Sequence, residues 1–269
     1  MIHLSARERI ERFAQQLRDG DPDLALRLIV ELTSEFPDQA PLHLHHARAL
    51  RAVGREADAL AAVMRMIDLK SDYAPAWLLK AELSADGKGL LPEVDLRKAL
   101  ALDTGLARAH FFLARVLNAA NRRTEAEAEL TSALDWDPGQ YDAYAERALW
   151  RRREAQVSAD PNDPDQIQTA GGLSLSRSKL LIARADYLCA LQFKNDPSVR
   201  AQLGEVLHEL HEYELALAAY DAVLAVTPSD DARYAAVLAL RAQSLRALQE
   251  AIARAAAQIT QPCEMPALD

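Results

Sequence analysis

Two pairs of histidines have a spacing at which neighbouring turns of a helix can chelate a metal ion. His43 and His46 flank His45 in the run HLHH, and His208 and His211 repeat the i, i+3 spacing. Residues at this spacing share one helix face, so both imidazoles of a pair can reach one ion. The sequence places no further Cys, Asp or Glu ligand beside them, and the positions normally pack between helices. We therefore expect packing roles and predict no metal and no cofactor.

Two other stretches resemble ligand-binding motifs but lack their defining residues. Asp160–Asp165 reads DPNDPD without the alternating oxygen ligands, central glycine and closing glutamate of a calcium loop. Gly87–Gly89 reads GKG without the spacing and the following Ser or Thr of a phosphate-binding loop. GxSxG, HExxH and dinucleotide-binding glycine patterns do not occur in the sequence. The sequence thus predicts no catalytic residue, and we do not expect an enzyme.

Composition restricts the class of protein further. Half of the 269 residues are hydrophobic, only 9 are glycine, and Ala, Leu, Arg and Glu are abundant, which favours helices around a sizeable core. The net charge of -9 argues against a nucleic-acid partner. Met1–Gln16 carries charges where a signal peptide needs an apolar segment, and no later stretch is a membrane span, so we expect a cytoplasmic protein without membrane insertion. Cys189 and Cys263 predict a buried thiol and an exposed tail thiol rather than a disulfide.

The sequence repeats itself with a period of 34 residues, most clearly in residues 107–140 and 197–230. Small residues at the eighth position of each unit allow two helices to approach closely, and a proline at the thirty-second position ends the second helix. The shared positions are Leu113, Ala114, Leu117, Ala126, Leu130, Ala133 and Pro138 in the first segment, and Leu203, Gly204, Leu207, Ala216, Tyr220, Val223 and Pro228 in the second. Each unit is therefore predicted to be a pair of amphipathic helices.

This pattern closely resembles the tetratricopeptide-repeat family, which implies an all-α solenoid of helical hairpins forming a right-handed superhelix. We expect one domain over residues 1–269, with repeats at residues 6–39, 40–73, 74–106, 107–140, 141–196 and 197–230. Capping helices are expected over residues 231–259, followed by a tail at 260–269. The third repeat slips by about one residue before Pro92. The fifth is interrupted by residues 154–175, whose Pro, Asp, Asn and Gly predict an irregular, exposed and mobile loop.

The resemblance implies that the first helices of successive repeats line a concave groove that binds a partner. An arginine fork suits carboxylates, so the five arginines on this face predict an acidic protein or peptide segment, with an apolar side chain near Phe111. Alternatively, these arginines are solvated or paired with Glu82, Asp142 and Glu146. The expected groove residues are Leu44, Arg48, Arg51, Leu78, Glu82, Arg108, Phe111, Arg115, Asn118, Leu149 and Arg152.

These features favour a protein-interaction module, such as an adaptor, an assembly factor or a chaperone-like protein. The carboxylate clamp of heat-shock chaperone partners in this family uses Lys and Asn where this chain has residues such as Leu44 and Arg48, which argues against a chaperone-tail ligand. Two alternatives stay open: a non-catalytic partner of a transferase-type enzyme or of a secretion or assembly complex, and a self-associating structural repeat protein. The sequence leaves the partner's identity and the oligomeric state open.

Overall fold

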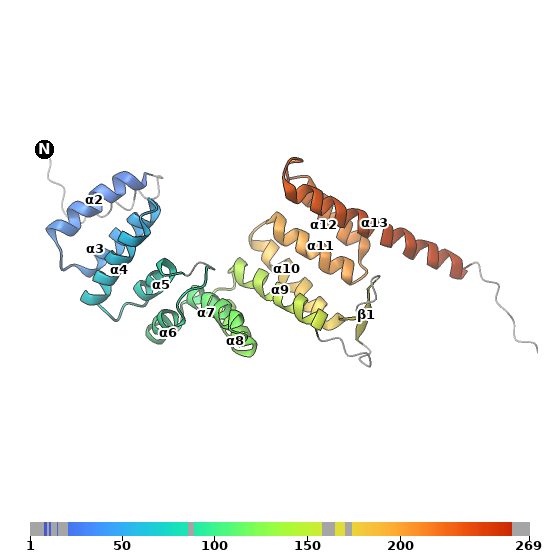
Figure 1. Ribbon diagram of the computed structural model, residues 1–269, viewed down its shortest axis with the longest axis horizontal. Helices are drawn as coiled ribbons and strands as arrows, with labels where there is room; N and C mark the ends of the chain where they lie inside the picture. The colour runs from blue at the N-terminus through green and yellow to red at the C-terminus, as the bar shows by residue number, and fades with distance from the viewer. Residues whose placement is uncertain are drawn as a thin grey trace, which may run out of the picture. The chain divides into compact units, whose positions relative to one another are not determined.

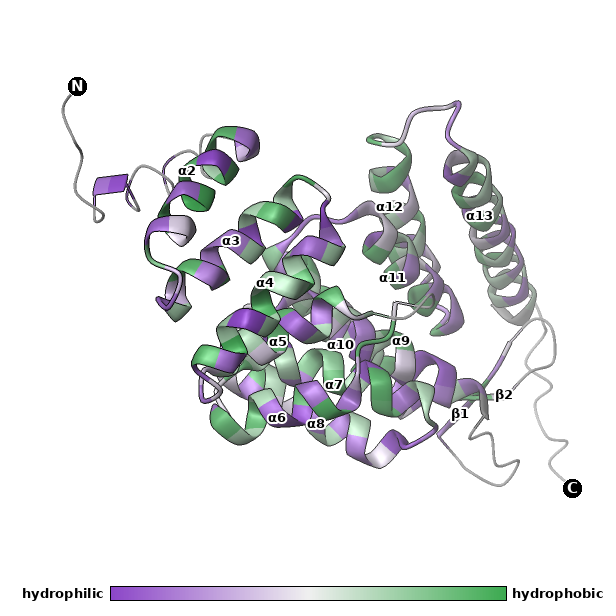
Figure 2. Ribbon diagram, turned by 60° about the vertical axis from the view of Figure 1, so that its left-hand side comes forward, coloured by the Kyte–Doolittle hydropathy of each residue, from purple (hydrophilic) through white to green (hydrophobic). Residues whose placement is uncertain are grey.

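The computed structural model describes residues 8, 9, 11, 15, 21–85, 89–157, 165–169 and 174–259. It divides into two compact units, Met1–Pro138 and Gly139–Asp269, which are described separately (Figure 1). Helices make up most of the described residues, which confirms the predicted all-α class. Hydrophobic and hydrophilic residues alternate along the helices, as expected where one face is buried (Figure 2).

From residue 21 onward, the described part of unit 1 consists of helix α2 followed by three helical hairpins. Helix α2 packs on α3, and the hairpin partners are α3 with α4, α5 with α6, and α7 with α8. Pro41 and Pro75 occupy the first turns of α3 and α5, where a missing N–H costs nothing. The helices span Pro22–Glu35 (α2), Ala40–Ala52 (α3), Glu56–Leu69 (α4), Ala74–Leu83 (α5), Glu93–Leu102 (α6), Ala107–Ala119 (α7) and Arg123–Trp136 (α8).

The turns α3–α4, α7–α8 and α11–α12 share one backbone geometry. Gly54, Asn121 and His211 occupy the fifteenth position of their repeats and have positive φ angles of 78°, 60° and 66°. The following N–H reaches back to a carbonyl of the first helix in each case, as in Arg55 N to Leu50 O at 2.9 Å. This is the Schellman arrangement, which reverses the chain while satisfying the last helical carbonyls.

Unit 2 begins with a hairpin of α9 (Tyr141–Val157) and α10 (Arg177–Phe193), and the segment between them differs from the predicted irregular loop. Helix α9 continues through Val157, and the strands β1 (Gln166–Gln168) and β2 (Ser174–Ser176) form an antiparallel pair in which Ile167 faces Leu175. Both apolar side chains join the core of the unit. A single hydrophobic residue flanked by polar ones in each strand explains why one face of the pair is buried. Residues 158–164 and 170–173 lie outside the described residues.

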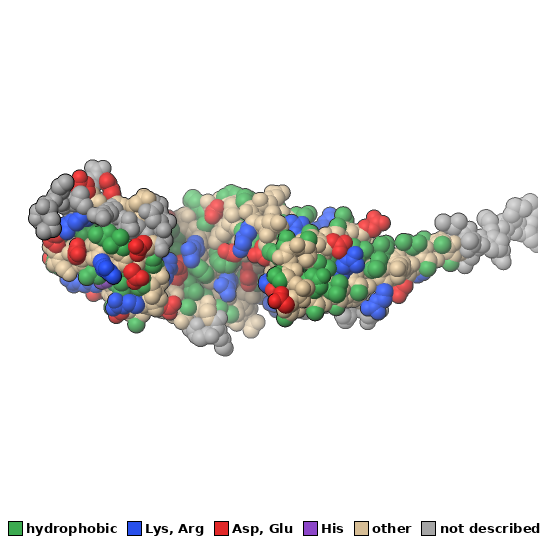
Figure 3. Space-filling model, turned by 90° about the horizontal axis from the view of Figure 1, so that it is seen from above, with side chains coloured by type: hydrophobic (Ala, Val, Ile, Leu, Met, Phe, Trp, Pro, Cys, Tyr) green, Lys and Arg blue, Asp and Glu red, His purple; other side chains and the backbone are tan. Residues whose placement is uncertain are grey.

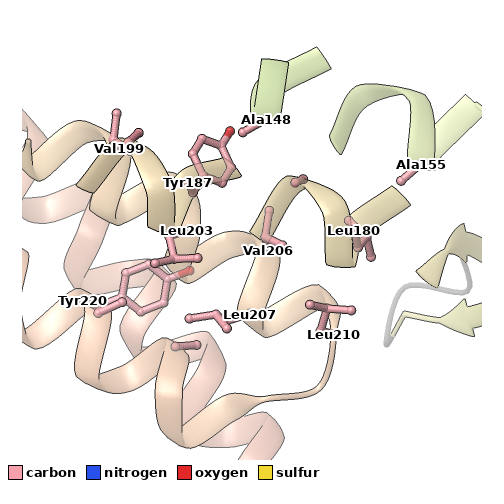
Figure 4. Packing of buried hydrophobic residues seen from close by; sticks show 14 of the residues in the cluster. Ala148, Ala155, Leu180, Tyr187, Val199, Leu203, Val206, Leu207, Leu210 and Tyr220 are labelled. Carbon is pink, nitrogen blue, oxygen red and sulfur yellow. The ribbon is translucent and has the colours of Figure 1, made fainter. Parts of the chain in front are cut away.

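The rest of unit 2 comprises α11 (Pro197–Glu209), α12 (Tyr213–Leu224) and α13 (Ala232–Ile259). Tyr220 packs among Leu203 and Leu207 in the core (Figure 4), where it is 1% exposed. A Cβ atom added to Gly204 would lie 2.6 Å from the Tyr220 ring, so this close approach requires glycine.

One continuous helix, α13, forms the closing segment, and it packs on α12 and α11. Cys189 is partly rather than fully buried. The predicted tail, with Cys263, lies outside the described residues, as does most of the first helix of the first repeat. Within the described part of the chain, no helix combines the length and the apolar character needed to cross a membrane.

Candidate functional site

The first helices of the three hairpins in unit 1 present a common charged face. Glu82 on α5 accepts a hydrogen bond from Arg51 on α3, and its other carboxylate oxygen lies 3.1 Å from Nε of Arg108 on α7. The Glu82 side chain is only 12% exposed, whereas the two arginines are 42% and 61% exposed. A single carboxylate thus ties three successive first helices together while both guanidinium groups remain open to solvent.

Two more arginines extend this surface along its outer helices. Arg48 lies one turn before Arg51 on α3, and Arg115 lies two turns after Arg108 on α7, so the helical period places each on the same side as its neighbour. Together, Arg48, Arg51, Glu82, Arg108 and Arg115 form what we call the arginine face. The arginine face has four cations and one anion, so its net charge is opposite in sign to that of the whole chain.

Arg48 and Arg115 differ from the other two arginines because neither forms an ion pair with any carboxylate among the described residues. Arg48 is exposed, and its charge adds to burial in lowering the pKa of the neighbouring His45. Arg115 is partly exposed, and its guanidinium carbon lies 5.9 Å from the centre of the Phe111 ring. These two guanidinium groups retain their donors for a ligand.

The apolar residues predicted for the groove form its floor rather than open contacts. Leu44, Leu78 and Phe111 are only 4%, 9% and 8% exposed. The Phe111 ring packs against that of Phe112 at a centroid distance of 5.4 Å, which explains why it is not an accessible apolar anchor. Asn118 lies near the end of α7 and is partly buried, and its carbonyl accepts the N–H of Asn121 in the turn.

Leu149 and Arg152 belong to unit 2, and Arg152 is already engaged. It hydrogen-bonds to Glu209 at 2.7 Å and pairs with Glu205 at the same distance, both on α11, and its side chain is 17% exposed. Burial lowers the pKa of this guanidinium, but the hydrogen bonds and charges of the two glutamates outweigh burial and raise it. Arg152 therefore braces α9 against α11, while Leu149 is partly buried beside it.

Of the partners suggested for these arginines, Glu82, Asp142 and Glu146, the first pairs with Arg51 and Arg108. Arg152 pairs instead with Glu205 and Glu209. Glu146 instead accepts the indole N–H of Trp150 at 3.1 Å. The sequence contains a signal that identifies the real partner. Arg51 and Arg152 stand at the twelfth position of their repeats, and Glu82 and Glu205 stand at the ninth position of the next one.

Three of the four histidines in these pairs have hydrogen-bond partners. His43 Nε2 lies 2.7 Å from the Pro37 carbonyl oxygen, His208 Nδ1 lies 2.9 Å from Ser244 Oγ, and His211 Nε2 lies 3.1 Å from the Gln168 carbonyl oxygen. No cluster of three His, Cys, Asp or Glu side chains suited to a metal ion occurs among the residues that the structure describes. These contacts give His43, His208 and His211 roles in joining helices, turns or the strand pair.

The helical hairpins and their Schellman turns place the chain among helical-repeat proteins. No protein-family model matches the sequence, and no curated protein matches it. Solved structures do match, among them PilW, described as a widely conserved type IV pilus biogenesis factor, with a TM-score of 0.63, 16% identity, and coverage of 86% of this chain and 97% of PilW. YrrB, described as a TPR protein with an unusual peptide-binding site, matches with a TM-score of 0.52 and 15% identity over 75% of this chain and 93% of its own.

A third similar structure is a chain of the APC/C hetero-tetramer Cut9–Hcn1, with a TM-score of 0.60 and 16% identity over 90% of this chain and 45% of that one. Similarity at these identities concerns the fold. The chain therefore has the tetratricopeptide-repeat fold, as the resemblance in its sequence predicted.

Proposed function

We propose that the chain is a protein-interaction module that binds an acidic segment of a partner protein on the arginine face of unit 1. The observation that carries the proposal is the pair Arg48 and Arg115, which keep accessible, unpaired guanidinium groups on a face whose other charges are already paired. The peptide-binding site named for YrrB and the role in type IV pilus biogenesis named for PilW support this class of function for the fold. The proposed site lies within unit 1 and does not include Leu149 and Arg152, which belong to unit 2.

The two kinds of arginine have different roles in this proposal. Arg51 and Arg108 are held by Glu82, so they fix the spacing of the three first helices before a ligand arrives. Arg48 and Arg115 supply planar donor forks that can take carboxylates of the ligand in bidentate geometry. Because all these groups are partly solvated, each contact contributes about 1 kcal/mol or less, and binding should weaken strongly with added salt.

A fluorescein-labelled peptide of alternating Glu and Ala tests the proposal by fluorescence anisotropy. We expect the unmodified chain to bind it at low ionic strength, and Arg48→Ala/Arg115→Ala to weaken binding by about tenfold, the loss of two such contacts. The matched control is Arg65→Ala/Arg123→Ala, which removes the same charge from the second helices α4 and α8 of the same two repeats.

The control should bind within about twofold of the unmodified chain, and a Gln/Ala peptide should not bind. Equal loss of affinity in both double variants would show that only net charge matters and would refute the arginine face as the site. Circular dichroism of each variant shows whether the helices are retained, so that a binding loss is not mistaken for unfolding.

A further inference from the structure

The second half of α13 extends beyond the helices on which its first half packs. Val237 and Ser244 are buried against unit 2, at 6% and 0% exposure, but no side chain described between Leu245 and Ala257 is buried. Figure 1 shows α13 continuing past α11 and α12, and hydrophobic side chains are visible along this part of it in Figure 3. Ala247, Leu248 and Ala251 are partly covered, while the other described side chains of this half are exposed. This half therefore gains less from tertiary packing, which normally supplies most helix stability.

The exposed half carries an apolar stripe with a heptad spacing. Leu245 is 37% exposed and Ile252, seven residues later, is 60% exposed. Leu248 and Ala255 lie between and beyond them, so that the intervals alternate between three and four residues. This spacing places all four side chains on one seam, which we call the α13 stripe, and it is the pattern by which helices pair in coiled coils.

The charged residues of this half avoid the stripe and its flanks. Arg246, Glu250 and Arg254 fall at the heptad positions that point away from the seam, while the positions beside the seam hold Gln249 and Ala251. Small, uncharged flanking residues allow a second helix to approach closely without desolvating a charge. The surface therefore fits another helix of the same alanine and leucine chemistry.

We propose that the α13 stripe binds the α13 stripe of a second copy of this chain in antiparallel orientation. When two such helices cross at Glu250, Leu245 of one copy faces Ala255 of the other, and Leu248 faces Ile252. The two-fold axis repeats both contacts with the copies exchanged, which is the condition for a closed, isologous dimer. Both contacts join apolar side chains only, so the seam buries no charge.

The position of unit 2 on α13 selects the antiparallel orientation. The first half of the helix packs on α12 and α11, so the second copy must bind along residues 245–259, about 22 Å of helix whose described side chains are exposed or only partly covered. A parallel pair would bring both copies of α12 to the same end of the seam, whereas an antiparallel pair places them at opposite ends. The seam is shorter than a standard interface, so we expect dimers at micromolar or higher concentration.

Sedimentation velocity of the full chain over about 1 to 200 μM tests the proposal, a range that brackets the expected micromolar affinity. The unmodified chain should shift from monomer to dimer as its concentration rises. Leu245→Glu/Ile252→Glu should weaken this association by at least about tenfold, because it places charges in the apolar seam. The matched control, Gln243→Glu/Ala253→Glu, adds the same charge to exposed positions on the same helix and should dimerise as the unmodified chain does. A monomer at all concentrations, or a dimer that both variants form equally well, overturns the proposal.

If α13 of one copy bound a groove of the second copy rather than its α13 stripe, variants of that groove would weaken the dimer. An apolar groove of about 320 Å³ lies between α10 and α12, with Leu188 and Leu215 on its rim. If Leu188→Glu/Leu215→Glu weakens the dimer as much as the stripe variant does, α13 docks in that groove of the second copy and the helix pair is wrong. A chain that stays monomeric while the stripe binds anionic lipid vesicles likewise overturns the proposal in favour of a membrane surface.

Spin labels on α13 test its orientation in the dimer. With Cys189 and Cys263 replaced by serine, single labels at Ala253 and Ala239 report the separation between the two copies by pulsed electron spin resonance. In the antiparallel pair the label at 253 has an axial offset of about 9 Å from its equivalent, and the label at 239 about 33 Å. Equal separations at both sites would mean a parallel pair and would overturn the proposed register.

Discussion

Replacing Gly204 with alanine should destabilise unit 2, although the same change stabilises most exposed helix interiors. The new Cβ atom would lie 2.6 Å from Cε1 of Tyr220, whose ring is 1% exposed and has no room to withdraw. Overpacking of this kind costs about 1 to 3 kcal/mol. The gain in helix propensity from Gly to Ala offsets about 1 kcal/mol of that cost. We therefore expect the free energy of unfolding to fall by about 1 kcal/mol.

Replacing Tyr220 with a residue that has no ring tests whether the ring causes this loss of stability. At the positions equivalent to Gly204 and Tyr220, the fourth repeat has Ala114 and Leu130, and both are completely buried. In a Tyr220→Leu background, Gly204→Ala should therefore meet no ring and should stabilise the unit by about 1 kcal/mol. The predicted signature is a change of sign, with a coupling energy of about 2 kcal/mol in the double-mutant cycle.

Urea unfolding followed by tryptophan fluorescence measures this change in unit 2. The chain has 3 tryptophans, and Trp150, which is 7% exposed, belongs to unit 2. A Trp77→Phe/Trp136→Phe background leaves it as the single reporter, so that unfolding of unit 1 does not contribute to the signal. If Gly204→Ala stabilises the unit with Tyr220 present, or has the same effect in both backgrounds, the contact with the ring does not explain why this position is glycine.

Two further predictions concern charged contacts. His110 Nδ1 lies 2.6 Å from Glu129 Oε2, and this hydrogen bond is the main cause that raises the pKa of His110. The resulting stabilisation should be complete below the unfolded pKa of about 6.5 and lost as the pH rises through the folded pKa, and Glu129→Gln should remove that dependence from urea unfolding profiles. Arg152→Ala leaves Glu205 and Glu209 without their shared cation, so the free energy of unfolding of unit 2 should fall by about 1 to 3 kcal/mol. Adding Glu209→Gln to that variant should restore part of this free energy, because it removes one of the two negative charges. If urea unfolding followed by Trp150 fluorescence shows that Arg152→Ala is as stable as the unmodified chain, Arg152 does not brace α9 against α11.

The period of 34 residues was sufficient to predict the helical hairpins, because it reports a physical requirement of each unit. Small residues such as Ala114 and Gly204 recur where two helices approach, and large neighbours such as Tyr220 recur where they fill the core. The strand pair between α9 and α10 was not predicted. Each of its strands has three residues with one buried apolar side chain, Ile167 or Leu175, which is too short for an alternating pattern to be distinguished from a loop.

Predicting the site was harder, because a helix position shows which side a residue faces but not whether a neighbour occupies it. Leu44 and Phe111 were placed on the expected face, yet both side chains are buried in the floor. Burial of this kind depends on how closely the adjacent helices approach, which is a property of the packed repeats rather than of one helix. Ion pairs between repeats are easier to predict from the sequence, because each of them joins two fixed positions of the 34-residue period.

The pairing of the twelfth position with the ninth position of the next repeat explains why Arg115 is available. Arg51 and Arg152 both follow this rule and meet Glu82 and Glu205. The residue that the rule assigns to Arg115 is Ala85, which has no charge and lies after the end of the shortened α5. An arginine at the ninth position without such a partner adds nothing to the stacking of repeats, so its charge is free to serve recognition. Because the irregular third repeat has Ala85 at its twelfth position, Arg115 keeps the unpaired charge on which the proposed binding function depends.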